Sequence, residues 1–162
     1  RSGGSEWVMF MPPLPAIRNL RPTEGMASYT ATGTPAPVAR VLAQIAAADA
    51  VVLACPEYNY SLAPALKNIL DWASREPDNA LLAGKPVAIL GAGGGMGTSR
   101  AQYHLRQVCV FLDLHPLNKP EVFANAFSGA FDADGNLTDA RLTQLVADQM
   151  RALAAWTRRL RG

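Results

Sequence analysis

The sequence predicts a single α/β domain, residues 1–162, in which a parallel sheet is covered by helices on both faces. The first observation behind this prediction is a regular alternation of short apolar runs with segments of helical periodicity, in units of about 30 residues. The second is that the apolar runs are continuous, as expected for strands that are buried on both faces. The third is the composition, because 162 residues with 49% hydrophobic and 17% charged content suit one well-packed core.

The front of the chain is less regular than the rest. Residues 1–24 contain four prolines, which exclude a long helix, and residues 25–32 form only a weak strand candidate. A helix is predicted to follow Thr34, which is a suitable N-cap, with Pro35 in the first helical position. Residues 50–55, AVVLAC, then predict the first clear strand.

The remaining elements continue the alternation to the end of the chain. Apolar residues at helical spacing predict the helices, and short apolar runs predict the strands. The predicted elements are a helix over 61–74, a strand over 86–90, a helix over 98–113, a less regular strand over 121–125, and an amphipathic helix over 138–160 capped by Thr138. Arginines near the end of the last helix complement its dipole.

Composition excludes several classes of protein. A net charge of +2 is too small to indicate a nucleic-acid partner. No apolar stretch reaches the roughly 18 residues of a membrane helix, so no membrane association is expected. Cys55 and Cys109 lie far apart in apolar segments, which predicts two core thiols rather than a disulfide or a metal site. A cytoplasmic location is therefore expected.

Two chemically unusual loops, residues 56–60 and 91–97, each follow a predicted strand directly. Both loops must therefore lie at the carboxyl edge of the sheet, because the strands are parallel. Ligands of open α/β sheets bind outside this edge. The position of the two loops is the first indication of a binding site.

The first of these loops reads Pro-Glu-Tyr-Asn-Tyr. Pro56 stiffens the exit from the strand, and Tyr58 and Tyr60 can flank an aromatic ligand. Asn59 offers both a donor and an acceptor, whereas Glu57 could serve as a general base although no histidine or second carboxylate lies near it in sequence. The residues alone leave two alternatives open, a ligand-binding loop and a turn whose tyrosines pack on the core.

The second loop, GAGGGMG, imitates the fingerprint G-x-G-x-x-G of dinucleotide-binding proteins. Met96 stands where the last glycine of that fingerprint belongs. Three alternatives remain for the loop: a pyrophosphate site, a flexible connector, or a bare backbone that approaches a flat ligand closely.

The other candidate sites are weaker. His104 lies within a predicted helix and His115 in a connection, so surface or packing roles are expected for both. Residues 132–136, DADGN, begin like a calcium loop but lack its glycine and glutamate, and are predicted to form a turn. No catalytic side chain and no metal ligand is assigned.

Two long segments resemble the signature segments of the NADPH-dependent FMN reductase family, which includes quinone, chromate and azo-dye reductases. They are CPEYNYSLAPALKNILDWASR and GKPVAILGAGGGMGTSRAQYHLRQVCVFLDLHPLNKPEVF, within a match over roughly residues 34–157. The resemblance implies a flavodoxin-like, three-layer, doubly wound fold with five parallel strands in the order 2-1-3-4-5. It also implies FMN bound across the strand ends, and a homodimer or homotetramer.

The resemblance also implies which residues hold the cofactor. The first loop would line the flavin ring and its ribityl side, and the second would bring backbone amides to the polar rim of the ring. The residues so assigned are Pro56, Glu57, Tyr58, Asn59, Ala92, Gly93, Gly94 and Gly95. In this picture Glu57 is part of the cofactor cradle rather than a catalytic acid. Support of the loop or of a subunit contact is implied for Lys67, Asn68, Asp71, Trp72, Arg100 and Gln102.

The front of the chain departs from the family pattern. Members of the family begin with an apolar strand that leads into a phosphate loop, of which only RSGGS is present here. The resemblance places Arg1 and Ser5 at the cofactor phosphate. The first strand, which should be central in the sheet, and the phosphate loop are expected to be either missing or rearranged in this chain.

The favoured function is that of an FMN-dependent NAD(P)H oxidoreductase. Hydride would pass from NADPH or NADH to the flavin, and electrons would then leave to a small-molecule acceptor such as a quinone, a flavin, an azo compound or a metal oxyanion. Two alternatives remain, a flavodoxin-type electron carrier and a scaffold that has lost flavin binding. The near balance of 15 basic and 13 acidic residues argues against the carrier, because such carriers are strongly acidic.

Overall fold

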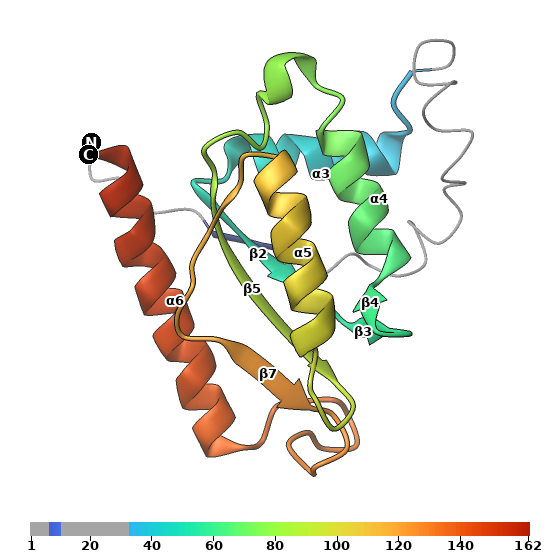
Figure 1. Ribbon diagram of the computed structural model, residues 1–162, viewed down its shortest axis with the longest axis vertical. Helices are drawn as coiled ribbons and strands as arrows, with labels where there is room; N and C mark the ends of the chain where they lie inside the picture. Colours follow the sequence, from blue (N-terminus) through green and yellow to red (C-terminus); the bar gives the residue numbers. More distant parts are fainter. Residues whose placement is uncertain (1–6, 11–32) are drawn as a thin grey trace.

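The computed structural model describes residues 7–10 and 33–162 and shows a parallel sheet with helices on both faces (Figure 1). In spatial order the strands of this sheet are β1 (Trp7–Phe10), β2 (Ala50–Ala54), β5 (Pro86–Gly93), and an edge made of β6 (His115–Pro116) and β7 (Val122–Asn125). Every pair of neighbours in it is parallel. The predicted doubly wound α/β architecture is confirmed.

The strand β1 occupies the place expected for the first strand of the fold. It lies parallel to β2, with Trp7 opposite Ala50 and Phe10 opposite Leu53. A parallel strand is thus present beside β2, where the resemblance expects the first strand. The predicted strand over 25–32 and the phosphate-loop residues Arg1 and Ser5 lie outside the described residues.

The strand β5 is longer than predicted. The apolar run ends at Leu90, but the strand continues to Gly93 because β7 pairs with it, from Leu90 opposite Val122 to Gly93 opposite Asn125. The first residues of β5 pair instead with the two-residue strand β6. One side of β5 therefore faces an edge that is split, with residues 117–121 between its two parts.

Of the helices that the structure describes, three cover one face of the sheet: α3 (Ala36–Ala47), α4 (Pro64–Ala73) and α5 (Ser99–Phe111). The C-terminal helix α6 (Ala140–Arg161) covers the opposite face (Figure 1). Successive side chains of a strand point to opposite faces, so Val51 and Leu53 of β2 pack under the three helices. Ala50 and Val52 of the same strand pack under α6.

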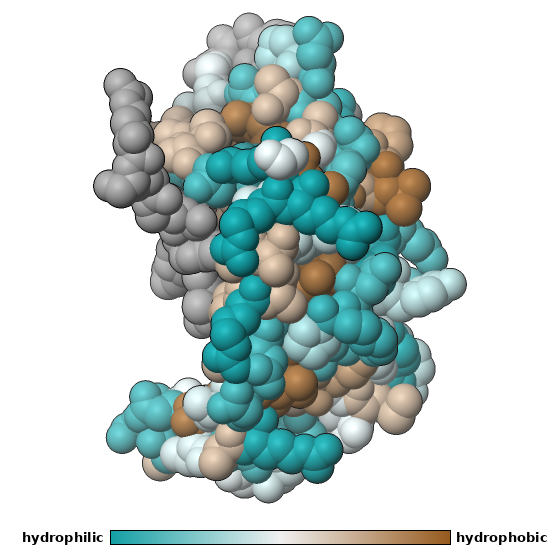
Figure 2. Space-filling model, turned by 90° about the vertical axis from the view of Figure 1, so that its left-hand side faces the viewer, coloured by the Kyte–Doolittle hydropathy of each residue, from teal (hydrophilic) through white to brown (hydrophobic). Residues whose placement is uncertain are grey.

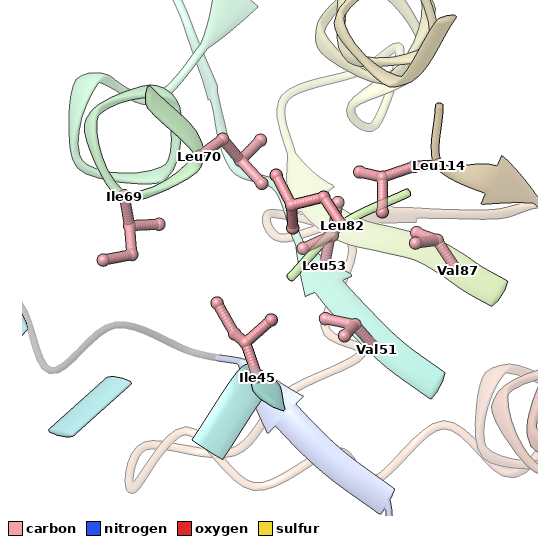
Figure 3. Close-up of a pocket in the computed structure, with 8 residues that line it drawn as sticks. All are labelled: Ile45, Val51, Leu53, Ile69, Leu70, Leu82, Val87 and Leu114. Carbon is pink, nitrogen blue, oxygen red and sulfur yellow. The ribbon is translucent and has the colours of Figure 1, made fainter. Parts of the chain in front are cut away.

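A small apolar cavity lies between the sheet and its helical cover (Figure 3). Its volume is about 10 Å³, and it is lined by Ile45, Val51, Leu53, Ile69, Leu70, Leu82, Val87 and Leu114. A cavity of this size holds a water molecule at most, and a water would find no polar partner among these side chains. It is a packing gap and not a ligand site.

The predicted N-caps of two helices are wrong by one residue. The residue that caps α3 is Pro35 and not Thr34, because Pro35 itself has an extended backbone with ψ of 140°. The cap of α6 is Asp139, whose Oδ1 accepts the Leu142 N–H at 2.6 Å. Thr138, which was the predicted cap, donates its hydroxyl to a loop carbonyl instead.

The outer surface of α6 is polar, as its amphipathic pattern predicts. Figure 2, which looks onto this side of the molecule, shows a mainly hydrophilic surface. The last turn of α6 carries Arg158, Arg159 and Arg161, and Arg161 also pairs with Asp49 at the start of β2. Among the helices of the described residues, none combines the length and the apolar character that crossing a membrane requires.

Candidate functional site

The loop after β2 is a short antiparallel hairpin. β3 (Glu57–Tyr58) pairs with β4 (Ser61–Leu62), so that Asn59 and Tyr60 form its turn. The prediction that a helix begins at residue 61 is wrong: α4 starts at Pro64. Leu62 has helical spacing to the apolar residues of α4, but the hairpin reverses the chain before that helix can begin.

Both turn residues of the hairpin have positive φ angles, 50° for Asn59 and 68° for Tyr60. Two positive φ values are what a type I′ hairpin turn requires, and asparagine tolerates them well. A tyrosine does not, because its Cβ crowds the backbone in the left-handed region at a cost of roughly 1–2 kcal/mol. Strain of this kind persists where surrounding contacts enforce it, and such places are often functional sites.

Arg100 of α5 provides one of those contacts. Its guanidinium carbon lies 3.6 Å from the centroid of the Tyr60 ring, which is a cation–π contact. The Tyr60 side chain nevertheless remains 65% exposed, and Tyr58 and Asn59 are exposed as well. The tip of the hairpin therefore presents two phenol rings and an amide to solvent.

Glu57 joins the hairpin to the N-terminus of α5. Its Oε1 accepts from Arg100 Nε at 2.7 Å and Nη2 at 2.5 Å, and its Oε2 accepts the backbone N–H groups of Arg100 at 3.1 Å and Ala101 at 3.2 Å. Thr98, the residue before the helix, makes no side-chain capping hydrogen bond, so the Glu57 carboxylate satisfies this helix end instead.

The Glu57 side chain is only 6% exposed. Burial raises its pKa, but hydrogen bonds from the Ala101 N–H and from Arg100 more than offset this effect, so the pKa lies below its ordinary value. A carboxylate with both oxygens occupied and a lowered pKa is a poor general base. Glu57 supports the hairpin from the α5 side through these contacts.

The glycine loop after β5 is a tight turn. The Gly97 N–H donates to Gly94 O at 2.7 Å, and the Ala126 N–H donates to Gly93 O at 2.7 Å. These bonds close the turn on itself and tie it to the end of β7. Of the three alternatives for this loop, the flexible connector does not agree with the structure.

The glycines of this loop fall into two groups. A Cβ at Gly91 would lie 2.2 Å from Cys55 O, and one at Gly93 would lie 2.4 Å from Gly97 O; Gly97 itself has φ of 59° and packs on Phe123. These three glycines are required by the packing of the turn itself. In contrast, a Cβ at Gly94 or Gly95 would meet nothing within 4 Å. Only these two positions leave the backbone open toward a ligand.

The N-terminus of α5 brings the two loops together. β3 contacts both β5 and α5, and β4 contacts α5, while the glycine turn runs directly into that helix (Figure 1). The predicted residues 56–59 and 92–95 therefore border the same region at the carboxyl end of β2 and β5. This region is the candidate site.

The structure places most of the residues for which the resemblance implied support of the loop or of a subunit contact. Gln102 does not lie at an interface, because it is 2% exposed and its amide bonds Thr98 Oγ1 and Val122 O. Trp72 lies in the buried core, whereas Lys67 and Asp71 form an ion pair along α4. The Arg100–Glu57 contact was not foreseen. The two residues lie 43 positions apart, so only the fold reveals it.

The remaining candidates agree with the predictions. His104 is exposed and contacts Ser61 Oγ through Nδ1 at 3.0 Å. Burial raises the pKa of the Cys55 thiol to about 11 and that of the Cys109 thiol to about 12, as expected of core thiols. Residues 132–136 form a turn in which Asp132 Oδ1 accepts backbone N–H groups.

A family model and similar relatives both point to FMN and quinone reductases. A family model described as NADPH-dependent FMN reductase matches residues 13–129. A relative from Pseudomonas aeruginosa named NAD(P)H-dependent FMN reductase is 57% identical over 133 residues, which cover 82% of this chain and 71% of the relative. A relative from Arabidopsis thaliana named NADPH:quinone oxidoreductase is 50% identical over 133 residues, covering 80% of this chain and 67% of the relative.

A solved structure agrees with this result. The structure of FerB from Paracoccus denitrificans, described as a flavoenzyme NAD(P)H:(acceptor) oxidoreductase, superposes with a TM-score of 0.71 at 28% identity. The superposition covers 83% of this chain and 73% of FerB.

Proposed function

Because the chain belongs to the NADPH-dependent FMN reductase family, we propose that it binds FMN and passes electrons from NAD(P)H to a quinone or another small acceptor. The observation that carries this proposal is the pairing of an exposed aromatic hairpin with a glycine turn, whose backbone is open at Gly94 and Gly95, at one edge of the sheet. The names of the relatives support the same activity.

The residues of the described site fit the flavin end of FMN. The rings of Tyr58 and Tyr60 can pack against a flat aromatic system, and the open backbone at Gly94 and Gly95 lets such a system come close. The charge of Glu57 is compensated by Arg100, so no unpaired carboxylate faces an electron-rich ring. We therefore propose that residues 56–59, Gly94 and Gly95 contact the cofactor, whereas Ala92 and Gly93, which the resemblance also assigns to it, lie within β5 and support the turn.

The protein's own role is to bind and orient. When bound, FMN supplies the redox chemistry by accepting a hydride from the nicotinamide and giving electrons to the acceptor. Pro56, Tyr58 and Asn59 would hold the ring from the hairpin side, and the glycine turn from the other. The phosphate would be held by Arg1 and Ser5, a proposal that rests on the family pattern alone.

We further propose that the protein is a homo-oligomer that associates through the outer face of α5. Tyr103, Val110 and Phe111 lie on one side of this helix and are exposed, the last two at 82%. Aromatic and branched apolar side chains in such number are typical of a subunit contact. Replacing Phe111→Glu should shift the mass measured by light scattering toward the monomer.

We also propose a cytoplasmic location. Cys55 and Cys109 are both free and buried, which suits a compartment in which thiols remain reduced.

Purification of the full chain with added FMN tests the proposed activity. The expected result is a yellow protein that oxidises NADPH or NADH in the presence of a quinone. Bound FMN without nicotinamide oxidation would indicate an electron carrier, and a protein that takes up no FMN would overturn the proposal.

The variant Tyr58→Ala tests the site within the same assay. It removes an exposed ring, so the fold should be retained while the Kd for FMN rises about tenfold, the loss expected for one aromatic packing contact. The matched control is Tyr103→Ala, which removes a ring from the outer face of α5 that is 67% exposed, against 48% for Tyr58. An unchanged Kd in Tyr58→Ala would contradict the site assignment.

A further inference from the structure

Two buried glutamines on opposite faces of the sheet share one arrangement. Gln102 of α5 is 2% exposed and Gln149 of α6 is 1% exposed. In each, the amide nitrogen donates two hydrogen bonds, and Oε1 is buried without a hydrogen-bond partner among the described residues. An unpaired buried acceptor costs stability, so the value of each glutamine lies in the groups that its nitrogen holds.

The two acceptors of Gln149 belong to the split edge of the sheet. Its Nε2 donates to Ile89 O at 2.9 Å and to Pro120 O at 3.0 Å. Ile89 lies in β5 and Pro120 in the connection between β6 and β7. Gln149 therefore links α6 to β5 and to the connection between β6 and β7. Neither of its two acceptors belongs to the glycine turn.

The two acceptors of Gln102 hold the glycine turn itself. Its Nε2 donates to Thr98 Oγ1 at 2.8 Å and to Val122 O at 2.9 Å. Thr98 is fully buried and directly follows the turn, and its Oγ1 would lie 2.7 Å from a Cβ at Gly91. Val122 begins β7, and the next residue in that strand packs on Gly97. One amide group thus fixes both the end of the turn and the strand beneath it.

From this geometry we infer that Gln102 is a positioning residue, which holds the glycine turn so that Gly94 and Gly95 present their backbone to the cofactor in a fixed orientation. The inference rests on the proposed FMN function. Gln102 acts through Thr98 and Val122, from beneath the turn, whereas the open side of the turn faces the candidate site.

The test compares Gln102→Met with Gln149→Met in the full chain. Each substitution keeps the length of the side chain and removes two donors from a buried site, so both variants should lose a similar amount of stability. FMN affinity is measured by quenching of flavin fluorescence, and the flavin absorption spectrum is recorded for each variant. Hydrogen exchange of the amides of residues 94–97 is measured in the protein without cofactor.

The expected result separates the two variants. Gln102→Met should bind FMN about tenfold more weakly, with a shifted flavin spectrum, and should exchange the amides of residues 94–97 faster than the unaltered chain. Gln149→Met should keep the FMN affinity within about twofold and the exchange of those amides unchanged.

Two outcomes would overturn the inference. One is an FMN affinity and turn exchange in Gln102→Met that equal those of the unaltered chain. The other is an equal loss of FMN affinity in both variants. Such a result would show that the affinity falls because the fold is less stable, and not because the glycine turn has moved. Failure of the unaltered chain to bind FMN would overturn the proposed function, and hydrogen exchange would still decide whether Gln102 holds the turn.

Discussion

The hairpin after β2 and the glycine turn after β5 border the same site but are built in opposite ways. The hairpin presents the side chains of Tyr58 and Tyr60 to solvent, and the backbone of Tyr60 adopts a strained conformation with positive φ. At Gly94 and Gly95 the turn presents open backbone, next to the exposed side chain of Met96, and three of its other glycines serve its own packing. Both are fastened to the N-terminus of α5, the hairpin by the charged Glu57–Arg100 contact and the turn by the neutral amide of Gln102. A binding site can thus use one helix end as a common support for two loops of different chemistry.

The strongest way to break the turn is Gly91→Ala. The new Cβ would lie 2.2 Å from Cys55 O, a backbone atom that cannot move aside without displacing β2. We expect a loss of about 3 kcal/mol in the free energy of unfolding, measured by urea denaturation. The control Gly94→Ala adds the same methyl group to open space and should change stability by less than about 0.5 kcal/mol. Equal losses in the two variants would contradict the division of the glycines into two groups.

The corresponding change in the hairpin is Glu57→Gln. It removes the charge that pairs with Arg100 and satisfies the helix end, and we expect a loss of about 2 kcal/mol in the free energy of unfolding. This figure is below that of a fully buried ion pair because the Arg100 side chain is 37% exposed. The control Asp71→Asn breaks an exposed pair on α4 and should cost less than about 0.5 kcal/mol. A loss no larger than that of the control would show that Glu57 is not the support of the hairpin.

The same carboxylate predicts how stability depends on pH. Its pKa in the folded protein is lower than the value of about 4.3 in an unfolded chain, so its contribution is fully present above that value and is lost as the pH falls through the folded pKa. The difference in unfolding free energy between the unaltered chain and Glu57→Gln should be constant from pH 7 to about 5 and should shrink below about pH 4. A difference as large at pH 3 as at pH 7 would contradict the role of the ionised carboxylate.

The smallest expected effect is that of Tyr60→Asn on stability. Asparagine relieves the strain of a positive φ, worth about 1 kcal/mol, but loses the contact with Arg100, worth about 0.5–1 kcal/mol. The free energy of unfolding should therefore change by less than about 0.5 kcal/mol, while the Kd for FMN rises if the ring faces the cofactor. A variant that is more stable and binds FMN as tightly as the unaltered chain would show that the strain serves no binding function.

Local patterns predicted the architecture because they are set by local chemistry. The continuous apolar run at residues 50–55 indicated a buried strand, and the helical spacing of apolar residues located α4, α5 and α6 to within a few residues. The hairpin could not be predicted in this way, because Leu62 fits the helical pattern and only the turn at Asn59 and Tyr60 overrides it. The end of β5 was missed for a related reason: Gly91 to Gly93 become a strand only because β7 lies beside them.

The candidate site was predicted in position but not in detail. The two unusual loops indicated the carboxyl edge of the sheet, where the structure brings them together, whereas the assignment of their residues to a flavin stays a prediction. The supports of the site depend on contacts between distant parts of the chain. Glu57 meets Arg100 only in the folded protein, and Gln102 meets Val122. The sequence shows which loop residues are chemically unusual for their position. Only the fold shows which distant residues fix those loops in place.

The split edge of the sheet also affects how the protein can associate. An edge strand offers unpaired backbone groups to which another sheet can add, and aggregation follows when such a strand is long and flat. Here β6 has two residues and β7 has four, and the connection between them carries Pro120 and the charged pair of Lys119 and Glu121. An intruding strand would find no continuous row of partners on this edge. In the proposed homo-oligomer, association would therefore use the helices, and the exposed apolar face of α5 would meet a partner without competition from sheet-to-sheet pairing at this edge.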